Sequence, residues 1–106
     1  MILLLSTSDT DLIAAHASGA DYRVANPSRI IVDDVPAMAA DADLVIVRIL
    51  GGVRAWEDGL AAVTSTETPV VVLSGEQQPD PDLMALSTVP AGVVADAHNY
   101  FAAGGV

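Results

Sequence analysis

The chain has 106 residues and a formal net charge of −10, which comes from fourteen acidic residues and four basic ones. This length suits a single domain with one core. An excess of acid this large argues against binding to nucleic acid or to an anionic membrane, because both partners are bound by neutralising their phosphates. The absence of cysteine excludes disulfides and thiolate metal sites.

Three aliphatic runs and one short segment, YRVA, predict four β-strands. They cover Ile2–Ser6, Tyr22–Ala25, 44–50 and 70–73. The run at 44–50 does not alternate with polar residues and ends at Gly51-Gly52, so it is predicted to be a central parallel strand that is buried on both faces. The run at 30–32 either extends the sheet or packs beneath a loop. The first run is too short to span a bilayer and has no basic flank, which predicts a cytoplasmic protein without a membrane span.

Helical patterns separate the strands. Helices are predicted over 11–18, from Asp33 or Asp34 to Ala40, over 53–64 and from an Asp80 cap through 86, with a further element over 91–102. The helix over 53–64 has the clearest amphipathic pattern. Gly59 lies inside it and weakens it by roughly 1 kcal/mol relative to alanine. A close contact between this helix and the sheet would explain the glycine.

Strands and helices that alternate in this way predict an α/β fold. We expect a small open parallel sheet of about four strands flanked by helices, flavodoxin- or Rossmann-like, with right-handed crossovers. Residues 1–106 are expected to form one α/β domain.

Ligands of open parallel sheets bind beyond the carboxyl ends of the strands. Small hydroxyl residues, glycines, carboxylates and one cation follow those ends and form a candidate pocket: Ser6, Thr7, Asp9, Arg48, Gly51, Gly52, Ser74 and Glu76. The alternative interpretation is that each is an ordinary cap, turn residue or helix stop. No catalytic residue, cofactor ligand or metal ligand is assigned from the sequence.

Arg48 is the most unusual residue of the predicted central strand, because a buried guanidinium must be paired. One interpretation is that it recognises a carboxylate of a ligand or partner. The other is a structural ion pair with Asp9, Glu76 or Asp33, or extension of the side chain to solvent.

The other candidate groups have ordinary explanations. The first strand–helix loop has no glycine, so no dinucleotide-binding or Walker A loop is present. The acid pairs at 33–34 and 41/43 suit helix capping. His16 and His98 have no neighbours at ligand spacing. Trp56 is interpreted as a core or interface anchor, and the alternative is that it docks a neighbouring domain together with Tyr100 and Phe101.

Several strings carry a family resemblance. They are MILLLSTSDTDL at the start, YRVANPSRI at 22–30, DADLVIVRILGGVRAWEDGL at 41–60, and the stretch from PVVVLSG to NYFAAGG at 69–105. These strings resemble the N-terminal end of the CobN-type large subunit of aerobic cobaltochelatase, which is related to the large subunit of magnesium chelatase. The resemblance spans nearly the whole chain.

The resemblance implies that the chain is an N-terminal fragment of a much larger subunit. It implies a complex that inserts Co²⁺ into the tetrapyrrole hydrogenobyrinic acid a,c-diamide in cobalamin biosynthesis, with Mg-ATP hydrolysed by AAA+ partners of the CobS and CobT type. The domain itself is expected to be an accessory or docking domain that binds no cofactor and performs no catalysis. The alternative hypothesis is a small-ligand-binding or regulatory flavodoxin-like domain in which Arg48 meets an acidic group.

Overall fold

The computed structural model describes residues 1–8, 11, 13, 21–75 and 80–89. The predicted element over 91–102 and most of the predicted helix over 11–18 lie outside these residues. So do two members of the candidate pocket, Asp9 and Glu76.

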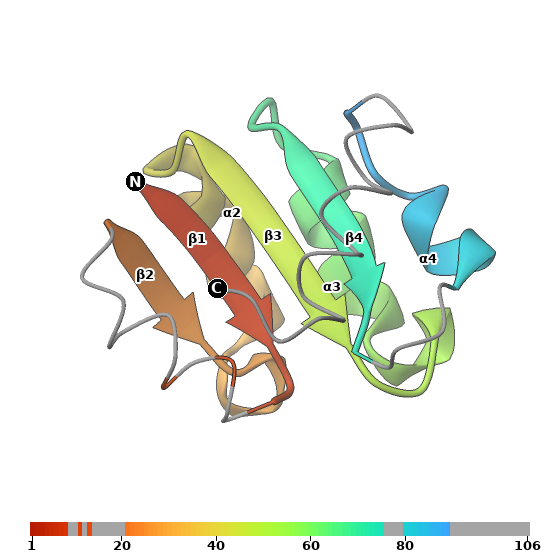
Figure 1. Ribbon diagram of the computed structural model, residues 1–106. Coiled ribbons are helices and arrows are strands. Elements are labelled where there is room, and N and C mark those ends of the chain that lie inside the picture. Colours follow the sequence, from red (N-terminus) through yellow and green to blue (C-terminus); the bar gives the residue numbers. More distant parts are fainter. Residues whose placement is uncertain (9–10, 12, 14–20, 76–79, 90–106) are drawn as a thin grey trace.

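Four parallel strands form one sheet. The strands are β1 (Ile2–Ser6), β2 (Tyr22–Ala25), β3 (Leu44–Ile49) and β4 (Val70–Ser74). Their order across the sheet is β2-β1-β3-β4, and every neighbouring pair runs parallel (Figure 1). The predicted α/β class and the predicted four-stranded parallel sheet are confirmed.

Helices α2 (Val35–Ala40) and α3 (Glu57–Thr64) lie together behind the sheet, and the short α4 (Pro81–Met84) lies beside the edge strand β4 (Figure 1). Three 3-10 turns join the elements: η1 (Pro27–Arg29), η2 (Val32–Asp34) and η3 (Val53–Ala55). The run at 30–32 therefore does not extend the sheet. Ile30 packs against the core, whereas Ile31 is exposed.

Each face of the sheet carries its own apolar cluster, because successive side chains of a strand point to opposite faces. On the α2–α3 face, Leu3, Leu5 and Val47 pack with helix residues such as Leu60 and Val63. On the opposite face, the cluster formed by the described residues is centred on four buried side chains: Leu4, Ile46, Val71 and Leu73. Burial on both faces confirms the prediction for the central strand.

The predicted helix over 53–64 begins later than its pattern suggested. Residues Val53–Ala55 form η3, and the backbone of Trp56 (φ −151°, ψ 47°) interrupts the helix before α3 starts at Glu57. This break lets the indole of Trp56 lie over Gly59. A Cβ at position 59 would sit 2.0 Å from Trp56 Cε2. The glycine therefore makes room for the side chain of Trp56, the residue that precedes its helix, and not for the sheet as the sequence suggested.

The predicted caps have different outcomes. Asp80 caps α4 as expected, because its Oδ1 accepts hydrogen bonds from the backbone N–H of Asp82 (3.0 Å) and Leu83 (3.3 Å). Asp34 precedes α2 without a side-chain capping bond. Within the part of the chain that is described, no helix has the length and apolar character needed to cross a membrane.

Candidate functional site at the carboxyl end of the sheet

The carboxyl ends of β1 and β3 meet at the point where the strand order reverses. The chain passes from β1 to β2 on one side, and then returns through α2 to β3 on the other. Ligands of open parallel sheets favour the crevice at such a reversal. Ser6 and Arg48 are register partners there. Two residues of the candidate pocket predicted from the sequence, Ser6 and Arg48, therefore lie side by side at this point.

Arg48 is held at this point by two neighbouring segments. Its Nη1 lies 2.8 Å from Oδ1 and 2.9 Å from Oδ2 of Asp11, and its Nε donates to the backbone oxygen of Ser74 at 3.3 Å. The side chains of Arg48 and Asp11 are only 10% and 14% exposed. The buried guanidinium thus has an internal carboxylate, as the structural interpretation required.

The carboxylate of Asp11 is positioned by the loop that follows β1. Asp11 lies in a helical segment, and its Oδ2 accepts a hydrogen bond from the Ser6 hydroxyl at 2.8 Å. Ser6 Oγ in turn accepts from the Ser8 backbone N–H at 3.1 Å, and Ser8 Oγ accepts from the Asp11 N–H at 3.4 Å. This network joins the loop after β1 to the end of β3.

Thr7 and the two glycines shape the neighbouring turn. Thr7 Oγ1 accepts a hydrogen bond from the Leu50 N–H at 3.2 Å, and the Thr7 N–H donates to the Arg48 oxygen at 3.2 Å. Gly51 and Gly52 have φ angles of +90° and +77°, which favour glycine. The turn ends β3 at Ile49 and leads the chain directly into η3.

The candidate pocket is therefore an assembled network. The structure brings Ser6, Arg48 and Ser74 together, and it places Thr7 and the two glycines in the adjoining turn. Asp33 has no recorded ion pair to Arg48, and the other two partners named from the sequence lie outside the described residues. Asp11 was missed. The available signal was that it is an acid in the first turn of the helix predicted to follow β1, the strand beside β3.

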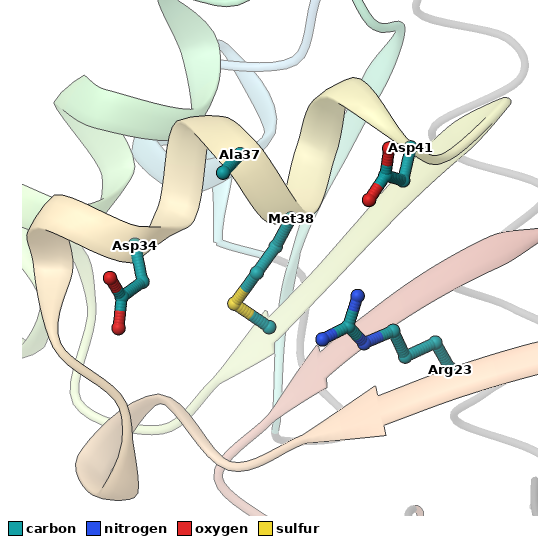
Figure 2. A pocket seen from close by; sticks show the side chains of 5 residues that line it. All are labelled: Arg23, Asp34, Ala37, Met38 and Asp41. Carbon is teal, nitrogen blue, oxygen red and sulfur yellow. The ribbon is translucent and has the colours of Figure 1, made fainter.

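Two hollows that the sequence did not suggest lie elsewhere. One, of about 310 Å³, is lined by Arg23, Asp34, Ala37, Met38 and Asp41. Figure 2 shows Arg23 of β2 and Asp41 pointing toward one another beneath α2, with Met38 between the two aspartates. The other, of about 340 Å³, is lined by Val32, Arg54, Ala55, Trp56, Glu57 and Asp58. We refer to it as the Trp56 hollow.

Metal ligation finds no support in the part of the chain that is described. No group of three or more histidine, cysteine, aspartate or glutamate side chains there is arranged to hold a metal ion. His16 and His98 lie outside the described residues.

Comparisons with known proteins give a consistent result. The chain is 35% identical to the aerobic cobaltochelatase subunit CobN of a Sinorhizobium species, over 98% of this chain and 9% of that protein. It superimposes with a TM-score of 0.90 and 50% identity on the catalytic subunit of cobaltochelatase from Mycobacterium tuberculosis, over 95% of this chain and 9% of that one. No protein-family profile matches. The chain spans about a tenth of the length of these relatives, and it is a homologue of the CobN-type subunit of aerobic cobaltochelatase over that segment.

Proposed function

We propose that these 106 residues form the N-terminal, accessory domain of a cobaltochelatase large subunit. The observation that carries the proposal is the 50% identity and the TM-score of 0.90 to a cobaltochelatase catalytic subunit. In the complete enzyme, the subunit inserts Co²⁺, as substrate, into hydrogenobyrinic acid a,c-diamide. AAA+ partners of the CobS and CobT type hydrolyse Mg-ATP, and the complex acts in the cytoplasm.

The accessory role is supported by the state of the crevice. The position where an open parallel sheet would bind a ligand is taken by the chain's own Asp11, held against Arg48 and Ser6. A ligand carboxylate would have to displace that side chain from a largely buried position. The ligand-binding alternative requires such an exchange, whereas an accessory domain needs only the assembled fold.

The proposal is tested with the reconstituted enzyme. Purified residues 1–106 are expected to hydrolyse no ATP and to insert no cobalt. The large subunit without these residues, mixed with its partner subunits, ATP, Co²⁺ and the tetrapyrrole, is expected to insert cobalt more slowly than the complete subunit. Cobalt insertion is followed by the absorbance of the tetrapyrrole. ATP hydrolysis by the isolated chain, or an unchanged rate without it, would overturn the accessory role.

A further inference from the structure

Large exposed apolar side chains occur in segments that follow the strands of the described sheet. The large hydrophobic residues with high exposure among the described residues are Ile13 (70%), Ile31 (67%) and Leu50 (48%). They follow β1, β2 and β3 in the chain, which are three adjacent strands. Single exposed apolar residues are common on protein surfaces, but grouping at one end is a mark of an interaction surface.

The Trp56 hollow adds an aromatic anchor, two acids and one arginine to this end. Val32 and Arg54, which line it, belong to η2 and η3, the turns that follow Ile31 and Leu50. Trp56 is half-buried, because its ring packs over Gly59. Half-buried tryptophans in such pockets often anchor protein interfaces. Glu57 and Asp58 are exposed beside it.

The opposite end of the sheet has a different surface. The segments that precede the strands there present exposed acids, namely Asp21, Asp41, Asp43 and Glu67. None of the large, highly exposed hydrophobic residues within the described ranges lies at that end.

A macromolecule fits the carboxyl end better than a small molecule does. The apolar residues follow three adjacent strands that lie about 4.8 Å apart. The surface therefore spans roughly 10 Å across the sheet, in addition to the width of the hollow. Because the chain carries a net charge of −10, and the exposed acids Glu57 and Asp58 outnumber the exposed Arg54 at the Trp56 hollow, the facing surface is expected to be basic.

We propose that this carboxyl-end surface, made of Ile31, Leu50 and the Trp56 hollow, docks against a basic surface of the remaining part of the same large subunit. This inference rests on the proposed function. The chain spans 9% of its relatives, so nine-tenths of such a subunit is tethered to it. Tethering gives an effective concentration on the order of millimolar for short linkers, which favours an intramolecular occupant over a separate partner.

The absence of cysteine from the chain provides a direct test in the full-length subunit. Ile31→Cys and Leu50→Cys place a thiol on the proposed surface, and Glu67→Cys places one at the opposite end as the control. Maleimide labelling of each position is followed by peptide mass spectrometry, with the urea-unfolded subunit giving the unprotected rate. We expect labelling at 31 and 50 to be at least about tenfold slower than at 67.

The charge requirement is tested with a matched pair of reversals. Glu57→Arg, added to the Leu50→Cys subunit, is expected to accelerate labelling at position 50, because it opposes a basic surface. Glu67→Arg is expected to leave that rate unchanged. An equal effect of the two reversals would overturn the basic character of the occupant.

The labelling results also separate the possible occupants. Labelling at 31 and 50 as fast as at 67 would overturn docking. Protection that arises only after the ATP-hydrolysing partners are added, or only at raised protein concentration, would show a partner subunit or a second copy and overturn the intramolecular occupant. Because labelling needs no cobalt insertion, protection in a subunit that inserts no cobalt would count against the proposed function and not against docking.

Discussion

The two ends of the sheet carry ion pairs of similar length, one largely buried and the other largely exposed to solvent. At the carboxyl end, Arg48 lies 2.8 Å from Asp11, and the two side chains are 10% and 14% exposed. At the amino end, the Met1 ammonium lies 2.6 Å from Asp43 and 3.5 Å from Asp21, whose side chains are 88% and 86% exposed. Distance alone does not distinguish the two pairs, but burial does.

This difference decides what each pair contributes. Breaking a buried pair leaves a charge without solvent or partner, which is strongly destabilising. Breaking an exposed pair leaves both charges in contact with water, so such a pair contributes little to the free energy of unfolding. The carboxyl end is therefore the end whose side chains depend on one another, and the amino end tolerates change.

The largest expected effect is that of Arg48→Met, which leaves Asp11 buried without its cation. We expect a loss of about 3 kcal/mol in the free energy of unfolding, measured by urea denaturation. The double variant Arg48→Met/Asp11→Leu is expected to recover most of that loss, because it removes both charges together. If the double variant is as unstable as the single one, the pair is not the reason for the loss.

Gly59→Ala tests packing at the same end. The added Cβ would lie 2.0 Å from Trp56 Cε2, so the indole must move. Overpacking of this kind costs roughly 1–3 kcal/mol, and the better helix propensity of alanine offsets about 1 kcal/mol of it. We expect a net loss in thermal stability together with a red-shifted Trp56 fluorescence. A more stable variant with unchanged fluorescence would show that the glycine makes no room for the ring.

Asp80→Ala removes the α4 cap, which also lies beyond the carboxyl end. Two backbone N–H groups lose their acceptor, and the expected cost is about 1 kcal/mol. The matched control is Asp82→Ala, an exposed acid of the same helix. Equal denaturation midpoints for the two variants would contradict the capping role.

The smallest effect is expected at the amino end, from Asp43→Asn. The hydrogen bond that the Met1 ammonium donates to the Asp43 carboxylate raises the pKa of the ammonium above its ordinary 8.0, and the same bond lowers the pKa of Asp43 below 3.8. The raised pKa of the ammonium contributes to folding stability below pH 8, and this contribution is lost as the pH rises through the pKa of the folded state. The lowered pKa of Asp43 contributes to folding stability above pH 3.8, and this contribution is lost as the pH falls below that value.

Denaturation midpoints of the wild type and Asp43→Asn should therefore differ slightly near pH 6 and converge at strongly alkaline and strongly acidic pH. A difference at pH 6 as large as that of Arg48→Met would contradict the distinction between the two ends.

Much of the fold could be predicted, because its signals are local. Aliphatic runs of strand length locate β1, β3 and β4, and Asp80 before Pro81 is a local capping signal. The start of α3 could not be predicted in this way. The positive φ angles of Gly51 and Gly52 and the contact of Trp56 with Gly59 depend on the three-dimensional path of the chain.

The sequence could group some residues of the candidate pocket, but it did not point to Asp11. The carboxyl ends of parallel strands necessarily share one edge, so Ser6, Arg48 and Ser74 could be grouped from sequence alone. The partner of Arg48 depends on the register between β1 and β3 and on how Ser6 and Ser8 position Asp11. Those features are tertiary, and they bring Asp11 to Arg48.

The most direct test of the central claim, that the crevice at Arg48 is structural, is the rate of cobalt insertion by a large subunit that carries Arg48→Met/Asp11→Leu. The measurement uses the reconstituted enzyme with saturating Co²⁺, ATP and tetrapyrrole, after circular dichroism has shown that the variant is folded. We predict a rate close to that of the wild type. A folded variant that no longer inserts cobalt would show that Arg48 acts on a ligand or partner and would contradict the claim.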